Sequence, residues 1–172
     1  MTAAHRIGTG FDVHRLVSGR ALVLGGVTIA SLRGLDGHSD GDCVIHAVCD
    51  AVLGALAAGD MGRHFPSWDA AWKGADSSLF LAAVADMAVH AGYAVANLDV
   101  TVVAEAPVLS PHVEGMRANL ARSLRVDTAV VSVKAKSTDG LGSIGRGEGI
   151  AAHAVVLLER DRPRRIDDHR KR

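Results

Sequence analysis

The sequence predicts an α+β fold, a mixed β-sheet with helices packed on one face, in the order β-β-α-α-β-α-β-β. Apolar segments with the composition of strands stand near both ends of the chain, and the segments between them carry helix caps and stops. A chain of 172 residues, 48% of them apolar, is long enough to bury one core. A single domain is therefore expected over residues 1–160.

Two strands are expected within the first 30 residues. Residues 5–14 have strand character, although Gly8 and Gly10 weaken the pattern. Residues 21–30 are apolar and β-branched around a Gly-Gly pair, which suits a β-bulge. The sequence thus predicts two strands, the second of them bulged.

Two helices are expected to follow. Residues 43–58 are strongly apolar, begin after a turn of Ser, Asp and Gly, and end before Gly59. An Asp-Ser-Ser cap starts a second helix, which runs from residue 76 to about residue 91 and stops at Gly92. The small residues of the first helix predict close packing against a sheet or a neighbouring chain.

The second half of the chain supplies the remaining elements. Residues 95–104 alternate as a half-buried strand does, and a Ser-Pro pair starts a helix over residues 110–124. Two more strands are expected over residues 130–135 and 150–159. Residues 161–172 are mainly Arg, Asp and Lys, and a solvated, disordered tail is expected there.

Charge and hydropathy exclude some classes of partner. With 19 basic and 19 acidic side chains the net charge is zero, so no general basic field exists to hold nucleic acid. The apolar stretches end well before the ~18 residues that suggest a membrane span. The first six residues are too short and polar for a secretory signal. A cytoplasmic protein that binds neither nucleic acid nor membrane is expected.

Cys43 and Cys49 are the only cysteines, and both fall on the first expected helix. Six residues of helical rise separate them by about 9 Å, whereas a disulfide needs Cα atoms within about 7 Å. Two packed thiols are predicted, as in a reducing compartment.

The pattern Asp12-Val13-His14, followed later by His46, predicts a metal site. Asp12 and His14 stand two apart and share one face of an extended strand, and His46 lies four residues into the expected helix. Two imidazoles and one carboxylate with an open fourth position are the ligands of a catalytic zinc. Asp50, one turn after His46, would either orient that imidazole or form a helix-surface or inter-subunit ion pair.

Four of the nine histidines carry no such argument. A packing or surface role is expected where a histidine has no other polar candidate near it in the sequence. The histidines in this group are His5, His90, His153 and His169. A lone Asp-x-His would by itself be an exposed strand end, and it is the added segment His38-Ser-Asp-Gly-Asp42 that favours the metal.

Two further segments suggest ligand contacts. Residues 134–149 combine Lys134, hydroxyls, Asp139 and Arg146 with many glycines, which suits a phosphate site but also a plain glycine-rich hairpin. Asp139 is a hard ligand suited to Mg²⁺ or Mn²⁺ on a phosphate. Neither a P-loop nor a dinucleotide fingerprint is present. Residues 104–110 form either a connector or a loop that offers its backbone to a base edge.

Together these segments resemble one family, the 2-C-methyl-D-erythritol 2,4-cyclodiphosphate synthases of the non-mevalonate isoprenoid pathway. The resemblance covers residues 6–159. It rests on IGTGFDVHRL, GHSDGDCVIHAVCDAVLGALAAGDMG, HFPSWD, KGADS, LDVTVVAEAP and DGLGSIGRGEGIA.

The resemblance implies a phosphorus–oxygen lyase that converts 4-diphosphocytidyl-2-C-methyl-D-erythritol 2-phosphate to the cyclic diphosphate and CMP. The substrate's own 2-phosphate attacks the β-phosphorus. Asp12, His14 and His46 would bind Zn²⁺, and Asp139 would help to hold Mg²⁺ or Mn²⁺ on the diphosphate. His38 and Ser137 match residues that stabilise the transition state.

The resemblance also implies a homotrimer with active sites between subunits, in which Arg146 lies near the threefold axis. It assigns substrate contacts to three groups of positions. Around the metal these are Asp12, Val13, His14, His38, Ser39, Asp60, Met61, Gly62, Phe65, Pro66, Ser67, Trp68 and Asp69. Around the cytidine phosphate they are Ala104, Glu105, Ala106, Pro107, Val108, Leu109, Ser110, Lys136, Ser137, Thr138 and Asp139. Near the axis they are Ser143 and Arg146.

The chain departs from the family pattern at four of these positions. Lys136 and Ser137 replace two threonines, Ser143 replaces a bulky apolar residue, and Asp139 replaces a glutamate. Ser137 keeps the hydroxyl, and a bridging water can make up the shorter reach of Asp139 to Mg²⁺.

The residues alone also fit two other functions. A zinc hydrolase would activate water on the same three ligands, with Asp40 or Asp42 as the general base. A non-catalytic trimer would bind metal and isoprenoid phosphates without turnover. The agreement of three separate motifs favours the cyclase.

Overall fold

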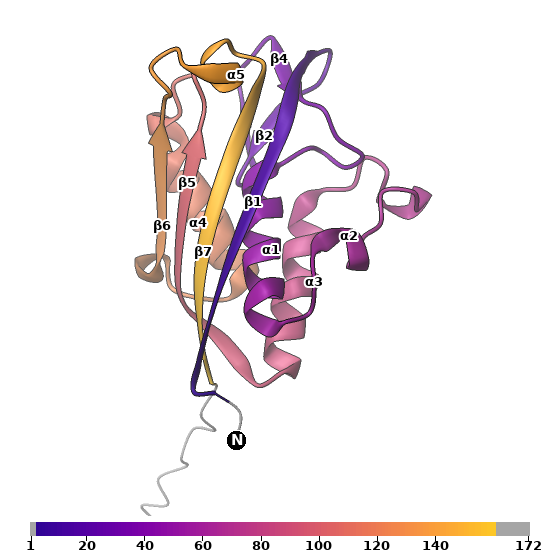
Figure 1. The fold of residues 1–172 in the computed structure, drawn as a ribbon, viewed down its shortest axis with the longest axis vertical. Coiled ribbons are helices and arrows are strands. Elements are labelled where there is room, and N and C mark those ends of the chain that lie inside the picture. The colour runs from indigo at the N-terminus through magenta and orange to yellow at the C-terminus, as the bar shows by residue number, and fades with distance from the viewer. Residues whose placement is uncertain (1–2, 161–172) are drawn as a thin grey trace, which may run out of the picture.

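The computed structural model describes residues 3–160, and the expected tail over residues 161–172 lies outside the described residues (Figure 1). The strands are β1 (His5–Ser18), β2 (Leu22–Leu24), β3 (Val27–Ile29), β4 (Arg33–Leu35), β5 (Tyr93–Val103), β6 (Val131–Lys136) and β7 (Gly149–Arg160). The helices are α1 (Cys43–Leu56), α2 (Met61–His64), α3 (Ser77–His90), α4 (Val113–Leu124) and α5 (Gly142–Gly145). Three short 3-10 turns complete the fold, η1 (Ala70–Trp72), η2 (Ser110–His112) and η3 (Thr128–Val130).

A five-stranded mixed sheet in the order β4-β1-β7-β5-β6 forms the centre of the fold. β1 and β5 both run antiparallel to β7, whereas β5 and β6 are parallel. Because β5 and β6 are parallel, the loops that follow them leave the sheet at the same edge. Helices α1, α3 and α4 lie on one side of this sheet (Figure 1).

Glycines in β1 allow α1 to lie directly against the strand. A Cβ at Gly8 would stand 1.9 Å from the Ala51 carbonyl oxygen, and one at Gly10 would stand 2.0 Å from that of Ala47. The two glycines and Asp12 share one face of the strand, since side chains alternate. The glycines that weakened the strand pattern are therefore required for the packing that brings α1 to Asp12.

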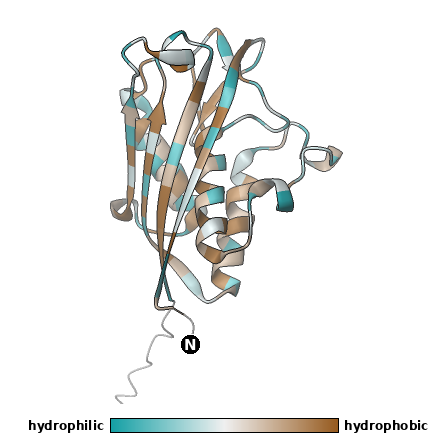
Figure 2. Cartoon of the chain, in the orientation of Figure 1, coloured by the Kyte–Doolittle hydropathy of each residue, from teal (hydrophilic) through white to brown (hydrophobic). Residues whose placement is uncertain are grey.

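The core lies between the sheet and the three long helices. Buried residues of α1 such as Val48 and Val52 pack with Leu98 and Val100 of β5 and with Val156 of β7. Figure 2 shows the hydrophobic residues along the central strands and the helices behind them. Cys43 and Cys49 are both buried free thiols, as predicted, and burial raises the pKa of each.

The α+β class and the helices on one face are confirmed, but the order of elements was incomplete. The single bulged strand over residues 21–30 is wrong, because β2 and β3 form a hairpin of their own. Its turn is Gly25-Gly26, where φ is 56° and 70°. These left-handed values are readily available to glycine, so the pair reverses the chain instead of bulging a strand.

Short elements were also missing from the expected order. β4, α2 and α5 contain three or four residues each and carry no periodic pattern. Residues 110–124 form the 3-10 turn η2 and then α4, so the expected helix begins in a tighter turn. Among residues 3–160, no helix is both long and apolar enough to cross a lipid bilayer.

Candidate active site

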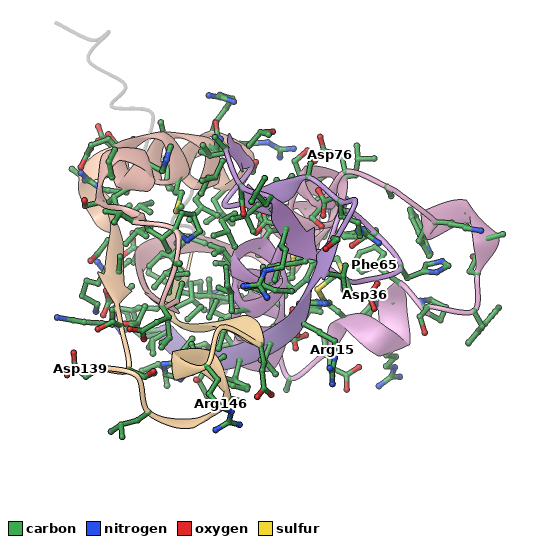
Figure 3. The ribbon with its side chains drawn as sticks, turned by 90° about the horizontal axis from the view of Figure 1, so that it is seen from above. Arg15, Asp36, Phe65, Asp76, Asp139 and Arg146 are labelled. Atoms are coloured by element: carbon green, nitrogen blue, oxygen red, sulfur yellow. The ribbon has the colours of Figure 1, made fainter. Side chains whose placement is uncertain are left out.

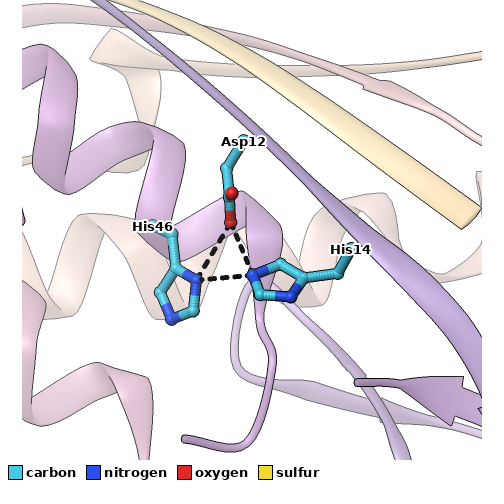
Figure 4. A group of neighbouring side chains, drawn as sticks. All are labelled: Asp12, His14 and His46. Atoms are coloured by element: carbon cyan, nitrogen blue, oxygen red, sulfur yellow. Dashed lines mark hydrogen bonds and ion pairs between the residues drawn. The ribbon is translucent and has the colours of Figure 1, made fainter. Parts of the chain in front are cut away.

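Asp12, His14 and His46 converge at the contact between β1 and α1 (Figure 4). Asp12 Oδ2 lies 2.9 Å from His14 Nε2 and 3.0 Å from His46 Nδ1, and the two nitrogens are 3.2 Å apart. The three side chains are only 12–26% exposed. The expected meeting of the Asp-x-His strand with the histidine of the helix is therefore present.

The spacing of these atoms fits a tetrahedral metal ion. Zinc bonds of about 2.0–2.1 Å place neighbouring ligand atoms about 3.3 Å apart. The three atoms are close to that spacing, and all lie within 4.8 Å of one another. The donor set of two imidazoles and one carboxylate suits zinc, and it leaves a fourth corner open.

The second nitrogen of each imidazole has its own partner. His14 Nδ1 is hydrogen-bonded to the backbone oxygen of Asp36. His46 Nε2 lies 2.9 Å from Ser77 Oγ and 3.2 Å from Ser39 Oγ. With these outer nitrogens engaged, His14 Nε2 and His46 Nδ1 are left to face the shared point, which is the usual arrangement of histidine ligands.

The charges of the cluster reinforce one another. Burial acts to raise the pKa of Asp12, but its hydrogen bonds with His14 and His46 outweigh burial and hold that pKa well below its usual range. Burial acts to lower the pKa of His14, and its hydrogen bond with Asp12 more than offsets this, so the pKa of His14 is raised. The centre is thus an ionised carboxylate that attracts a cation, either a proton on His14 or a metal ion.

The three ligands open into a cavity of about 340 Å³. Its remaining walls come from the loop before α1, from α2 and the loop after it, and from α3. The lining residues besides the ligands are His38, Ser39, Met61, Gly62, Phe65, Ser67, Trp72 and Phe80. Phe65, Trp72 and Phe80 stack together with ring centres 4.8–5.5 Å apart, so one wall is aromatic.

The loop after α2 is tied to the predicted catalytic histidine. His38 Nε2 lies 3.0 Å from the backbone oxygen of Asp69. Asp60 caps α2, and Trp68 is 84% exposed beyond the cavity. Of the expected contacts over residues 60–69, Met61, Gly62, Phe65 and Ser67 line the cavity, whereas Asp60, Pro66, Trp68 and Asp69 are not among the lining residues.

The two segments expected to hold cytidine phosphate lie next to each other at the ends of β5 and β6. The Ala104 N–H donates to the Lys136 oxygen at 2.9 Å. The Glu105 carboxylate accepts from the N–H and the hydroxyl of Thr138, at 3.3 Å each. Asp139 follows in the left-handed region with φ 52°, and its carboxylate accepts from the Ser137 hydroxyl at 3.2 Å. The parallel pairing of β5 with β6 thus joins the two loops.

One chain does not bring these loops to Asp12, His14 and His46. None of residues 104–110 or 136–139 lines the 340 Å³ cavity. Figure 3 shows Asp139 and Phe65 on opposite sides of the molecule. His38 and Ser137, the two predicted catalytic residues, therefore lie in separate regions of a single chain.

The other predicted residues of the glycine-rich segment, residues 134–149, lie in three different surroundings. Lys134 forms an ion pair with Asp99 of β5 and is not part of the phosphate loop. Ser143 lines a second hollow of about 160 Å³ beside His14. Arg146 donates to Glu148 at 2.6 Å and is largely exposed. The segment forms the short helix α5, so the plain hairpin considered for it is wrong.

Of the roles expected for Asp50, the structure does not bear out the orientation of the His46 imidazole. Asp50 Oδ1 accepts a hydrogen bond from the Met61 N–H at 2.8 Å, at the start of α2. Asp50 therefore positions α2, while hydroxyl groups contact the outer nitrogen of His46. Of the surface histidines, His90 bonds the Asp86 backbone and His153 bonds Thr9, as expected, while His169 lies outside the described residues.

The two carboxylates proposed as a hydrolytic base are already occupied. Asp42 is fully buried and accepts from four backbone N–H groups, those of Gly25, Gly26, Val44 and Ile45. Asp40 accepts from the N–H of Ser77, from its hydroxyl, and from the Asp42 N–H. Neither carboxylate lines the cavity, so the arrangement does not favour a zinc hydrolase.

Ser77 is a residue that the sequence did not single out as functional. It was expected only as part of a helix cap, yet it is fully buried and faces His46. The cap motif places it at the first turn of α3, but only the packing of α3 against α1 brings it to the metal ligands. No spacing rule in the sequence connects the two positions.

Comparison with known proteins gives matches over nearly the whole described chain. The family model described as the YgbB family matches residues 5–159. A protein of Geotalea uraniireducens named 2-C-methyl-D-erythritol 2,4-cyclodiphosphate synthase is 57% identical over 155 residues, which are 90% of this chain and 99% of that protein. The protein of the same name from Salinibacter ruber is 55% identical over 90% of this chain and 98% of its own length.

Solved structures are similar in the same region. The bifunctional IspDF of Campylobacter jejuni superposes with a TM-score of 0.87 at 39% identity, covering 91% of this chain and 42% of that longer one. IspF of Plasmodium falciparum in complex with CDP superposes with a TM-score of 0.83 at 32% identity, covering 94% of this chain and all of that one.

Proposed function

Since the chain belongs to the YgbB family, whose curated relatives are 2-C-methyl-D-erythritol 2,4-cyclodiphosphate synthases, we propose how its residues carry out that reaction. The enzyme is a cyclising lyase of non-mevalonate isoprenoid biosynthesis. It converts 4-diphosphocytidyl-2-C-methyl-D-erythritol 2-phosphate to the cyclic diphosphate and CMP. The observation that carries the assignment of roles is the convergence of Asp12, His14 and His46 at one point.

Asp12, His14 and His46 hold Zn²⁺ in this proposal, through Oδ2, Nε2 and Nδ1 respectively. The support is their spacing, their shielding from water, and the ionised state of Asp12. When bound, the ion acts as a Lewis acid and as a template for the substrate phosphates. Asp139 would help to hold Mg²⁺ or Mn²⁺ on the diphosphate, because hard carboxylate oxygens suit these ions.

The protein's own contribution is to position the reacting groups. The nucleophile is the 2-phosphate of the substrate, so neither a protein nucleophile nor a strong base is needed, and bringing it in line with the β-phosphorus is the main requirement. His38 lies in the metal cavity and Ser137 lies beside Asp139, where each would donate a hydrogen bond to developing charge on phosphate oxygens. The aromatic wall of Phe65, Trp72 and Phe80 would exclude water from one side.

The loops 104–110 and 136–139 are proposed to hold the cytidine phosphate. Glu105 and Thr138 tie the loops together, which would give a fixed set of backbone groups for the base and the phosphate. The solved complex of the Plasmodium falciparum relative with CDP supports a cytidine nucleotide as the ligand.

A homotrimer with active sites between subunits would join the two halves of the site. Within one chain none of residues 104–110 or 136–139 lines the cavity beside Asp12, His14 and His46, and Figure 3 has Phe65 and Asp139 on different sides of the molecule. The sheet face away from α1 exposes Ile7 (71%), Phe11 (60%) and Val13 (51%) in a row along β1. Such a row is typical of a surface that another chain covers. Arg146 and Ser143 would lie near the threefold axis, and a cytoplasmic location fits the two free thiols.

Product analysis tests this function. Purified protein is incubated with Mg²⁺ and the cytidylated phosphosugar, and phosphorus NMR follows the products. Equal amounts of CMP and cyclic diphosphate are expected. Release of inorganic phosphate would indicate the hydrolase instead, and tight binding without any product would indicate the non-catalytic module.

A further inference from the structure

Ser77, the first residue of α3, contacts the ring of His46 on the side away from the proposed metal ion. Its hydroxyl oxygen lies 2.9 Å from His46 Nε2 and also contacts Oδ1 of Asp40. The Asp40 carboxylate is fixed in turn, because Oδ2 accepts from the Ser77 N–H at 2.9 Å and Oδ1 accepts from the Asp42 N–H at 3.1 Å. Asp40, Ser77 and His46 thus form a chain of hydrogen bonds that ends at the metal centre.

The direction of this chain follows from the groups in it. The Ser77 hydroxyl donates its single hydrogen to Oδ1 of Asp40, whose carboxylate oxygens accept every hydrogen bond that they make here. The oxygen of Ser77 then accepts in its 2.9 Å contact with His46, and Nε2 supplies the hydrogen. The second lone pair of that oxygen is available to the Ser39 hydroxyl, which lies 3.5 Å away. With its proton on Nε2, a neutral imidazole has an unprotonated Nδ1, which is the atom that faces Asp12 and His14.

Other groups near His46 cannot easily replace this contact. Ser39 Oγ is farther from Nε2, at 3.2 Å, and it also accepts from the Gly41 N–H. Ser77 is fully buried, so water has no access to its position. The Asp40 N–H donates to the Ala75 oxygen at 3.0 Å, which holds the start of α3 in place.

We infer that Ser77, oriented by Asp40, is a positioning residue of the metal centre that keeps the His46 proton on Nε2 and leaves Nδ1 free to bind the ion. The inference rests on the proposed metal role of Asp12, His14 and His46. Loss of such an outer hydrogen bond typically weakens metal affinity by about 10–100-fold.

Zinc affinity of Ser77→Ala tests the inference. The metal-free protein is titrated with Zn²⁺ in competition with a chromophoric chelator. The dissociation constant of Ser77→Ala should rise by about 10–100-fold over that of the wild type. Ser78→Ala is the matched control, because Ser78 stands in the same helical turn and its hydroxyl has no contact with His46, so its affinity should equal that of the wild type. Equal affinities for the Ser77→Ala and Ser78→Ala proteins would overturn the inference.

A second measurement needs only the wild type and remains decisive if Ser77→Ala does not fold. In the zinc-loaded protein labelled with ¹⁵N-histidine, His46 should show a slowly exchanging Nε2–H with a nuclear Overhauser contact to the Ser77 β-protons. A proton on Nδ1, or an Nε2–H that exchanges freely with water, would overturn the role of Ser77. Absence of zinc binding by the wild type is a different result, because it would overturn the proposed metal site itself.

Discussion

At the scale of single residues, the proposed metal centre depends on which nitrogen of each histidine is free to bind an ion. Nδ1 of His14 is hydrogen-bonded to the backbone oxygen of Asp36, and Nε2 of His46 is hydrogen-bonded to the Ser77 hydroxyl. Each imidazole is therefore held in place by a partner outside the site. The ligands themselves could be predicted from the sequence, since the two-residue spacing of Asp12 and His14 fixes their common face. Their outer partners could not, because Asp36 and Ser77 meet the rings only through tertiary packing.

Replacing a ligand should abolish the site without unfolding the chain. His46→Ala removes one of three ligands, and we expect bound zinc and kcat to fall together, by at least about a hundredfold in kcat. Zinc content by elemental analysis and steady-state rates measure the two losses. His90→Ala is the control, because His90 is exposed on α3 and bonds only the Asp86 backbone. Full activity in a His46→Ala protein shown to lack zinc would refute the ligand role.

The ionic pair in the centre predicts how pH affects the metal-free protein and zinc binding. His14 has a raised pKa, so its stabilising effect is complete below its ordinary value of 6.5 and is lost as the pH rises through the raised pKa. Asp12 has a lowered pKa, so its effect is present above its ordinary value of 3.8 and is lost as the pH falls through the lowered one. Zinc must displace the His14 proton, and affinity therefore rises with pH.

We expect zinc to bind about tenfold more weakly for each pH unit below the raised pKa of His14. Titrations at about pH 6 and about pH 8.5 measure this, with the zinc-induced increase in Tm as a second readout. Identical affinities at the two pH values would show that no protonated ligand is displaced.

At the scale of elements, the site depends on how closely α1 approaches β1. Two strand residues span about 6.7 Å and four helical residues span about 6 Å, so successive residues on one face of β1 meet successive turns of α1. Gly8 meets Ala51 and Gly10 meets Ala47, and Asp12, the next residue on this face of β1, contacts His46, which precedes Ala47 in α1. Glycine is a poor strand former, so Gly8 and Gly10 weaken the sequence prediction of β1. The close packing of α1 against β1 nevertheless requires a residue without a side chain at both positions.

Gly10→Ala should therefore lower the stability of the protein, whereas Gly54→Ala should not. The new Cβ at Gly10 would meet the Ala47 oxygen at 2.0 Å, and we expect a loss of about 3 kcal/mol in the free energy of unfolding or a failure to fold. At Gly54, inside α1, the new Cβ would meet only the Thr9 oxygen at 3.7 Å, and a gain of about 0.5–1 kcal/mol is expected.

Denaturant unfolding of both variants compares the two positions directly. A Gly10→Ala protein as stable as the wild type would contradict the close packing of β1 on α1. The zinc content of Gly10→Ala should also fall if the protein folds, because His46 moves with the helix.

The elements also show where sequence patterns are insufficient. The long strands and helices were predicted because each carries at least two turns or alternations of apolar residues. The β2–β3 hairpin was not, because Gly25-Gly26 fits both a bulge and a tight turn, and only the positive φ values distinguish them. Asp42 stabilises the tight turn, because its carboxylate accepts hydrogen bonds from the N–H groups of Gly25 and Gly26 while it also caps α1.

At the scale of the whole molecule, the proposed site falls into two halves, a metal half around Asp12, His14 and His46 and a cytidine half in the loops 104–110 and 136–139. The three residues of the metal half could be predicted from spacing, whereas the cytidine half was implied only by the resemblance to the family. Their separation within one chain could not be predicted from spacing, because it depends on the width of the sheet between β1 and β6. The proposed trimer would bring the metal half of one subunit to the cytidine half of the next.

Mixed trimers test this arrangement. Chains with His46→Ala and chains with Ser137→Ala are co-expressed with different tags, and trimers that carry both tags are purified. In a closed ring, every such trimer has one interface at which an unaltered His46 faces an unaltered Ser137 of the next subunit. One working site out of three should give about a third of the wild-type kcat per trimer. A trimer made of either variant alone has no such interface and should be nearly inactive. Mixed trimers as inactive as their parents would show that each site is built within one chain.

The position of the metal ion tests the central claim most directly. Crystals of the zinc-loaded protein are measured on both sides of the zinc absorption edge to give an anomalous difference map. One peak is expected, about 2.0–2.2 Å from Asp12 Oδ2, His14 Nε2 and His46 Nδ1, with its fourth corner facing the cavity. A peak at other side chains, or none at these three in fully loaded protein, would contradict the account.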